Sequence, residues 1–443
     1  MQRREFLVLA AASGTLVSIG IPSFALPVPD IRRSATAITQ VFGDGVRLTG
    51  VAVEYERPVR NFDLSAAAFT VKDRTVTGIF TSTTADPSGR AETGRFVIIS
   101  LSPEDTNAPL VAKQPSDGRK GPPAGGPGGP GKAGDIPAYD TSYRSAEAVV
   151  TQGVQIRDSD GGVIPALPQP FGTDRIENLV VDDFQQLEFR DPDTGGLLRY
   201  NLFVPKDYDA QKAYPLVLFM HDAGATSDAT RTTLFQGLGA VCWASPGDQA
   251  ARPCFVLAPQ YAEIIADDDS KTSIMLDTTI NLLKSLSAKY SIDSKRLYAT
   301  GQSGGCMMAI AMNIKYPELF AASFLVAGQW DPALVKPLAK KKLWILVSED
   351  DDKAWPGQNA ITGVLEKEGA KVSRAIWDGT WDADQFNTAF AKIDAQGNPV
   401  NYVAFRTGTV IPAGESAAAA SGHRNTWRIA YGIAPIREWI FRH

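Results

Sequence analysis

The chain has 443 residues, of which 44% are hydrophobic and 21% are charged, and its formal net charge at pH 7 is −5. This length exceeds that of one typical hydrophobic core, so we expect two domains. The composition is that of an ordinary globular protein, and the slightly acidic balance gives no basis for nucleic-acid binding.

Residues 1–25 have the pattern of an export signal. Arg3 and Arg4 precede a short apolar run at 7–21, and Ser23-Phe24-Ala25 offers small residues before a cleavage site after Ala25. The arginine pair ahead of the run is typical of the twin-arginine route. A membrane anchor is the alternative, but polar residues and glycines interrupt the run. We therefore expect a periplasmic or secreted protein without stable membrane insertion.

Residues 36–165 show the pattern of an all-β domain. Short segments alternate apolar and polar residues with period two between turn residues, which predicts an antiparallel β-sandwich. The expected strands are 37–42, 46–55, 69–72, 76–80, 96–101 and 146–156. A Pro/Gly-rich stretch at 114–137 is predicted to be a mobile loop within this domain. Further prolines at 166–178 predict a linker.

Residues 179–443 alternate between expected strands and helices. This alternation predicts an α/β fold, with a mostly parallel sheet covered by helices on both faces. Functional sites in such sheets lie at the carboxyl ends of the strands. The expected strands are 197–205, 214–220, 254–258, 296–300, 322–327, 342–347 and 370–376, and the expected helices are 274–290, 307–313, one around Val364, and 428–441.

One motif in this second domain carries chemistry. Gly301-Gln302-Ser303-Gly304-Gly305 fits the pattern G-x-S-x-G between an apolar strand and an apolar helix. In such a nucleophile elbow a sharp turn presents the serine, and the glycines avoid collisions with neighbouring elements. The five residues alone are weak evidence, but the strand and helix around them strengthen it. Ser303 is the predicted nucleophile.

A serine nucleophile needs a base, and the chain has three histidines. His443 is the last residue, and His221 directly follows a strand. His423 lies in a predicted loop before the final helix, late in the chain, where the order serine, acid, histidine requires it. A surface position is the alternative for such a residue. By elimination we predict that His423 is the base.

The acid should follow a late strand. The run Glu349-Asp350-Asp351-Asp352 does so, and a carboxylate there would hold the imidazole tautomer and stabilise the imidazolium. Asp352 is the first choice and Asp351 the second, because spacing hardly separates them. Asp382 and Asp384 are weaker candidates. A solvated acidic loop or a calcium site is the competing interpretation.

The tetrahedral oxyanion of acyl transfer needs two preorganised N–H donors. We expect the amide of Gly304, directly after the nucleophile, and the amide of Ala223, in the loop after His221. The candidate pocket residues are His221, Asp222, Gln302, Trp330 and Trp355. Packing in the core or at a rim is the alternative for the two tryptophans.

Several motifs occur in the order of one enzyme family, namely Cys254–Gln260, Ile292–Tyr298, Gly301–Gly305, Tyr316–Ala322 and Gly422–Trp427. With them the chain resembles the α/β-hydrolase group of secreted carboxylesterases, often labelled predicted peptidases, some of which carry an N-terminal immunoglobulin-like domain. It is also similar to polyhydroxybutyrate-depolymerase and feruloyl-esterase-like enzymes. The resemblance covers residues 180–443 well and the β-domain more loosely. It implies that Ser303, Asp352 and His423 form a triad.

The chain departs from this family at three places. The usual His-Gly is His221-Asp222, which puts a carboxylate at the oxyanion loop, where it would weaken oxyanion binding. Gln302 and Gly304 stand where leucine and methionine are common. Residues 407–420 look like an insertion before the base.

The leading hypothesis is a secreted serine carboxylester hydrolase that acts through an acyl-enzyme on small or short-chain esters. The alternatives are a serine peptidase with the same triad and a catalytically weak binding protein that uses the β-domain. No cofactor or metal is expected, because the chain has no C-x-x-C pair and no Cys/His cluster. Cys242 and Cys254 are close enough in sequence to form a bridge, and Cys306 is predicted to be a buried thiol.

Overall fold

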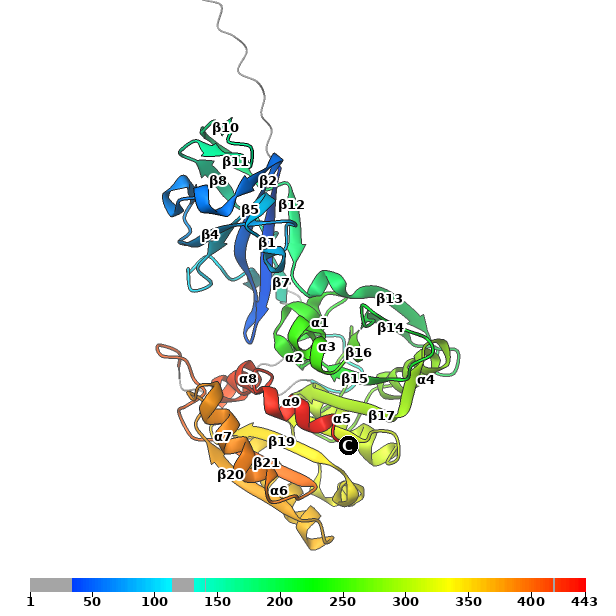
Figure 1. Ribbon diagram of the computed structural model, residues 1–443. Coiled ribbons are helices and arrows are strands. Elements are labelled where there is room, and N and C mark those ends of the chain that lie inside the picture. The colour runs from blue at the N-terminus through cyan, green and yellow to red at the C-terminus, as the bar shows by residue number, and fades with distance from the viewer. Residues whose placement is uncertain (1–33, 114–130, 140, 417–418) are drawn as a thin grey trace, which may run out of the picture. The chain divides into compact units, whose positions relative to one another are not determined.

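A computed structural model describes residues 34–113, 131–139, 141–416 and 419–443 (Figure 1). Residues 34–443 form one compact unit. The predicted signal peptide, and the part of the Pro/Gly-rich loop at 114–130, lie outside the described residues. Among the described residues, every helix is too short or too polar to cross a membrane.

The N-terminal part is a β-domain with two main sheets. A five-stranded sheet has the order β12-β1-β2-β5-β4, and a three-stranded sheet has the order β11-β8-β3. Buried side chains such as Val51, Val97 and Val150 form its core. The strands are β1 (Ala35–Phe42), β2 (Gly45–Arg60), β3 (Phe69–Val71), β4 (Val76–Ser82), β5 (Thr93–Leu101), β6 (Val111–Lys113), β7 (Thr141–Tyr143), β8 (Val149–Gln152), β9 (Ile156–Arg157), β10 (Val163–Ile164), β11 (Leu167–Gly172) and β12 (Arg175–Asn178).

The segment 166–178, predicted to be a linker, instead forms two strands of this domain. β11 pairs antiparallel with β8, and β12 pairs parallel with β1. The prolines were misleading because Pro168 and Pro170 lie on an edge strand, where a missing N–H group costs little ladder bonding.

The C-terminal part is a nine-stranded sheet in the order β13-β14-β16-β15-β17-β18-β19-β21-β20. β13 and β14 run antiparallel to their neighbours, and the other pairs are parallel. The mostly parallel sheet agrees with the prediction. The strands are β13 (Gln185–Arg190), β14 (Leu197–Phe203), β15 (Tyr214–Met220), β16 (Phe255–Gln260), β17 (Ile292–Gln302), β18 (Ala322–Val326), β19 (Leu343–Ser348), β20 (Val372–Trp377) and β21 (Val400–Phe405).

Helices cover both faces of this sheet (Figure 1). In β15, Val217 and Phe219 pack into one core cluster, whereas Leu216 and Leu218 pack into a second one. Successive residues of a strand point to opposite faces, so a strand covered twice reads as an unbroken apolar run. The helices are α1 (Thr232–Phe235), α2 (Leu238–Ala244), α3 (Pro246–Ala251), α4 (Met275–Lys289), α5 (Gly304–Lys315), α6 (Ala354–Lys367), α7 (Ala383–Asp394), α8 (Ala419–Ala430) and α9 (Ala434–Ile440).

The C-terminal end differs from the single predicted helix 428–441. Two helices, α8 and α9, occupy this part of the chain, and Pro435 lies in the first turn of α9. Proline is well tolerated in a first turn but disrupts a helix interior, so the chain starts a new helix there. His423, predicted to lie in a loop, belongs to α8, because this helix already begins at Ala419.

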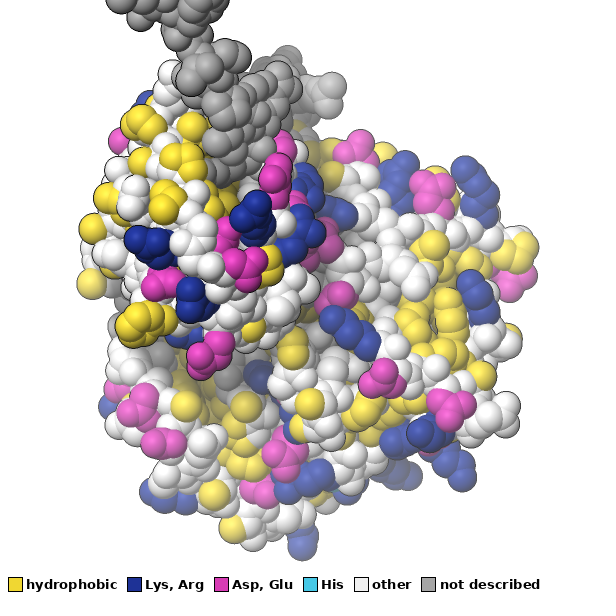
Figure 2. Space-filling model, turned by 45° about the horizontal axis from the view of Figure 1, so that its top comes forward, with side chains coloured by type: hydrophobic (Ala, Val, Ile, Leu, Met, Phe, Trp, Pro, Cys, Tyr) yellow, Lys and Arg dark blue, Asp and Glu magenta, His cyan; other side chains and the backbone are white. Residues whose placement is uncertain are grey.

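Charged side chains of both signs are interspersed over the face drawn in Figure 2. This distribution agrees with the small net charge of −5.

Candidate active site

The turn between β17 and α5 has the geometry of a nucleophile elbow. Ser303 adopts φ 51° and ψ −119°, a combination that is costly for a residue with a Cβ. Its amide donates to the carbonyl of Val326 in the neighbouring strand β18, with N and O 3.0 Å apart. A Cβ on Gly305 would lie only 2.0 Å from the carbonyl oxygen of Met220 in β15. Glycine at this position therefore allows α5 to pass close to the sheet.

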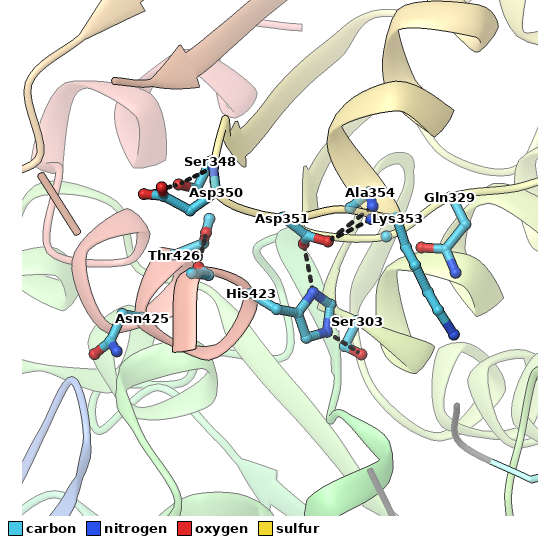
Figure 3. A network of polar contacts seen from close by, with 12 residues as sticks. Ser303, Gln329, Ser348, Asp350, Asp351, Lys353, Ala354, His423, Asn425 and Thr426 are labelled. Carbon is cyan, nitrogen blue, oxygen red and sulfur yellow. Dashed lines mark hydrogen bonds and ion pairs between the residues drawn. The ribbon is translucent and has the colours of Figure 1, made fainter. Parts of the chain in front are cut away.

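Ser303, His423 and Asp351 form a continuous chain of hydrogen bonds (Figure 3). The hydroxyl of Ser303 and Nε2 of His423 are 2.8 Å apart, and Nδ1 of His423 is 2.5 Å from Oδ2 of Asp351. A carboxylate can only accept, so Nδ1 carries the proton and Nε2 is free to accept from the serine. This tautomer is the one that general-base catalysis requires.

The carboxylate beside His423 is that of Asp351, the second choice from the sequence, and not that of Asp352. Asp351 follows β19, and only 2% of its side chain is exposed. Its other oxygen, Oδ1, accepts from the amides of Lys353 and Ala354 at the start of α6 (Figure 3). Asp352 is an exposed residue of the same turn. Spacing could not separate the neighbours because the turn alone decides which of them points inward. The weaker candidate Asp382 instead caps α7.

His423 is placed by close packing of α8 on the acid turn. A Cβ on Gly422 would lie 2.4 Å from the Cβ of Asp350, so glycine allows this approach. The indole of Trp427 meets the imidazole of His423 edge to face, with ring centroids 5.0 Å apart. One turn of the same helix therefore supports the ring orientation.

Two backbone amides lie near the turn that carries Ser303. Gly304 is the first residue of α5, and Ala223 is the first residue of a short 3-10 helix, Ala223–Ala225. First-turn amides have no acceptor within their own helix. A Cβ on Gly304 would lie 3.7 Å from the Ala223 nitrogen, so Ala223 is close to Gly304. They fit the requirement for paired oxyanion donors.

Asp222 supports this loop. Its Oδ1 accepts from the amide of Gly224 at 2.8 Å, and its Oδ2 accepts from Nε2 of Gln302 at 3.0 Å. Gln302 is almost fully buried and also donates to Gln236. We expected Asp222 to weaken oxyanion binding, but its charge is bound by these donors. Sequence reasoning missed that Asp222 and Gln302, two of the residues that depart from the family pattern, bind each other.

His221 has a structural role behind the loop. It is buried, and its Nδ1 donates to the carbonyl of Asp222 at 2.7 Å. Its Nε2 accepts from the amide of Tyr261 at 2.9 Å. Burial lowers the pKa of His221, which favours this neutral form. Both nitrogens are occupied by backbone groups, so the expected role of His221 in the pocket is not supported.

The remaining candidates also pack in the interior. Trp330 is buried in one core cluster, and Trp355 packs partly buried against it. The packing interpretation fits both. Cys242, Cys254 and Cys306 are free and buried, so the bridge considered for the first two does not form. Within the described ranges, no group of three or more His, Cys, Asp or Glu side chains is placed to hold a metal ion.

Residues 34–165 match the model of the esterase Ig-like N-terminal domain family. Over 92% of the chain, the structure matches a solved structure described as a thermostable esterase, with a TM-score of 0.74 and 26% identity, and it covers 99% of that chain. This is the architecture of an α/β-hydrolase esterase with an Ig-like domain. Both parts of the predicted fold are thus confirmed, and the β-domain is called the Ig-like domain below.

Two curated relatives match shorter stretches. A feruloyl esterase B of Talaromyces stipitatus is 25% identical over 144 residues, which are 31% of this chain and 37% of the relative. An acetylxylan esterase A of Aspergillus ficuum is 49% identical over 41 residues, which are 9% of this chain and 14% of the relative. The chain therefore spans less than half the length of each of these relatives.

Proposed function

We propose that the protein is a serine carboxylester hydrolase that works through an acyl-enzyme. The observation that carries the proposal is the hydrogen-bonded series Ser303–His423–Asp351, with the backbone of Ala223 close to Gly304. Such a series supplies a nucleophile and an orienting carboxylate after the carboxyl ends of the parallel strands β17 and β19, and a base on helix α8.

The geometry implies a sequence of proton transfers. As Ser303 Oγ attacks the ester carbonyl carbon, its proton moves to Nε2 of His423, and Asp351 stabilises the imidazolium. The amides of Ala223 and Gly304 bind the oxyanion. The imidazolium then protonates the leaving alcohol, and the acyl group stays on Ser303. A water molecule, deprotonated by His423, attacks this acyl-enzyme and releases the carboxylic acid and the free serine.

The proposed substrates are small or short-chain carboxylic esters. Support comes from the relatives, which are described as a feruloyl esterase, an acetylxylan esterase and a thermostable esterase. A panel of acetyl, butyryl and feruloyl esters, with aminoacyl p-nitroanilides as amide comparisons, would define the preference. An enzyme that cleaves the anilides faster than the esters would contradict the proposal.

The direct test is labelling with a fluorophosphonate, which reacts with activated serines. The wild type should be labelled and should hydrolyse p-nitrophenyl acetate, and Ser303→Ala should lose both properties. Ser287→Ala is a matched control, because Ser287 lies on α4 and its hydroxyl donates to the carbonyl of Leu283. Unchanged labelling of the Ser303→Ala protein would refute the proposal.

We also propose export to the periplasm or the exterior by the twin-arginine route. The support is the arginine pair and apolar run of residues 1–25. Replacing Arg3 and Arg4 with lysine should leave the protein in the cytoplasmic fraction of a bacterial host that has this route. Unchanged export of that variant would contradict the proposed route.

A further inference from the structure

A short arm of the Ig-like domain reaches the catalytic domain. The arm consists of residues 131–139 and 141–143, and its last three residues form β7. It makes hydrogen bonds to two places in the catalytic domain, the segment 262–267 and the loop that carries Ala223.

The first contact resembles a piece of β-ladder. The amide of Gly134 donates to the carbonyl of Ile264, and the amide of Ile264 donates to the carbonyl of Asp135, both at 2.8 Å. The hydroxyl of Tyr139 donates to the carbonyl of Ala262 at 2.6 Å. The arm is therefore held along the segment that follows β16.

That segment is bonded in turn to the oxyanion loop. The amide of Tyr261 donates to Nε2 of His221 at 2.9 Å, and the amide of Ser227 donates to the carbonyl of Tyr261 at 3.0 Å. The side chain of Gln260 donates to the carbonyl of Ala225 at 2.8 Å. Displacement of 260–262 would therefore move the backbone on both sides of Ala223.

The second contact touches the loop itself. The hydroxyl of Thr141 donates to the carbonyl of Gly224, one residue after the donor Ala223, at 3.3 Å. Two residues further along, the ring of Tyr143 packs edge to face on Phe235, with centroids 5.2 Å apart. Thr141 and Asp222 thus hold the same glycine, because Thr141 binds its carbonyl and the carboxylate of Asp222 binds its amide.

We propose that the arm positions the oxyanion donor, with Thr141 and Tyr139 as positioning residues. The inference rests on the proposed serine hydrolase function, and it assigns to the Ig-like domain a part in transition-state stabilisation. Neither residue touches the reacting atoms. The arm holds the backbone that supplies the Ala223 amide, and an oxyanion interaction develops only as the carbonyl becomes tetrahedral.

The test is a set of conservative variants. Thr141→Val removes the hydroxyl while keeping the side-chain shape, and it should lower kcat by about threefold to tenfold, well below the loss on deleting a whole oxyanion donor. The double variant Tyr139→Phe/Thr141→Val should lower kcat by about tenfold to a hundredfold. KM should change less than about twofold, because ground-state binding is not affected. Thr141→Ser should restore activity.

Fluorophosphonate inactivation gives an independent readout. The attack on phosphorus also places an oxygen in the oxyanion site, so the inactivation rate should fall in parallel with kcat. Ser142→Ala is the matched control, because Ser142 lies on the same strand and donates within the Ig-like domain to the carbonyl of Ala112. It should keep both rates.

The outcomes separate this inference from the proposed function. If Ser303→Ala is inactive but the Thr141 and Tyr139 variants keep wild-type kcat and inactivation rates, the positioning role is wrong and the nucleophile stands. If Ser303→Ala keeps its activity, the proposed function itself fails. A rate loss of equal size in Ser142→Ala would show a general effect of the strand and would also overturn the positioning role. Thermal unfolding of each variant shows whether a loss of activity reflects misfolding. If the Thr141 variants are misfolded, the kcat of the single Tyr139→Phe variant tests the positioning role: a wild-type value would overturn it.

Discussion

The choice between Asp351 and Asp352 gives the sharpest prediction. Oδ1 of Asp351 accepts from two amides, those of Lys353 and Ala354, and Oδ2 faces Nδ1 of His423. In Asp351→Asn the amide oxygen must remain opposite the two N–H groups, so the NH₂ group would face His423. Nδ1 would then have to accept, and Nε2 would carry the proton.

This wrong tautomer cannot take the proton of Ser303. Substitution of the orienting carboxylate by asparagine in the serine-protease triad lowers kcat by about 10,000-fold. At about 1.36 kcal/mol for each factor of ten, the loss corresponds to about 5.4 kcal/mol of transition-state stabilisation. We expect a decrease of that order for Asp351→Asn, with little change in KM.

Asp352→Asn is the matched control, because Asp352 is exposed and adjacent. Its kcat should stay within about twofold of wild type, as for most exposed substitutions. Initial rates with p-nitrophenyl acetate, normalised to folded protein by circular dichroism, measure both variants. If Asp351→Asn keeps more than a tenth of the activity, or if Asp352→Asn loses more than Asp351→Asn, the assignment of the acid is wrong.

Three further predictions follow from the site. Gln302→Leu leaves one oxygen of Asp222 without its donor, so kcat should fall about tenfold and the free energy of unfolding by about 1–3 kcal/mol, measured by urea denaturation. Gly422→Ala places a Cβ 2.4 Å from the Cβ of Asp350, so it should lower the free energy of unfolding by about 1–3 kcal/mol and reduce activity. Gly363→Ala, which has open space around the added Cβ, should lower neither. Equal effects of the two substitutions would refute the packing argument. The folded-state pKa of His221 lies below the ordinary 6.5, so the unfolded chain binds more protons than the folded one. The free energy of unfolding should therefore fall as the pH drops below about 6.5. If His221→Gln shows the same dependence of stability on pH, His221 is not the cause.

Local sequence patterns predicted the fold class well. The apolar run of β15 and the alternation of strands and helices indicated a parallel sheet, because burial on both faces requires continuous apolar side chains. The glycines around Ser303 indicated the elbow, because a residue without a Cβ is needed where two elements approach closely. Both signals are local, and the structure contains both features.

The sequence was less informative where a residue's role depends on a distant neighbour. Pro168 and Pro170 led to the prediction of a linker, because no local sequence feature shows that β11 is an edge strand. Asp222 was predicted to weaken oxyanion binding, because its partner Gln302 lies 80 residues away in the chain.

The sequence by itself determined that a strand, a strained serine turn and a helix would form, and that a late histidine was available as a base. Only the tertiary structure decided that Asp351 rather than Asp352 faces His423, and that the arm of the Ig-like domain contacts the oxyanion loop. The physical reason is that residue type and spacing depend on local backbone geometry and on burial. The direction of one carboxylate in an acidic turn, and a contact between segments 83 residues apart, arise only when the elements pack.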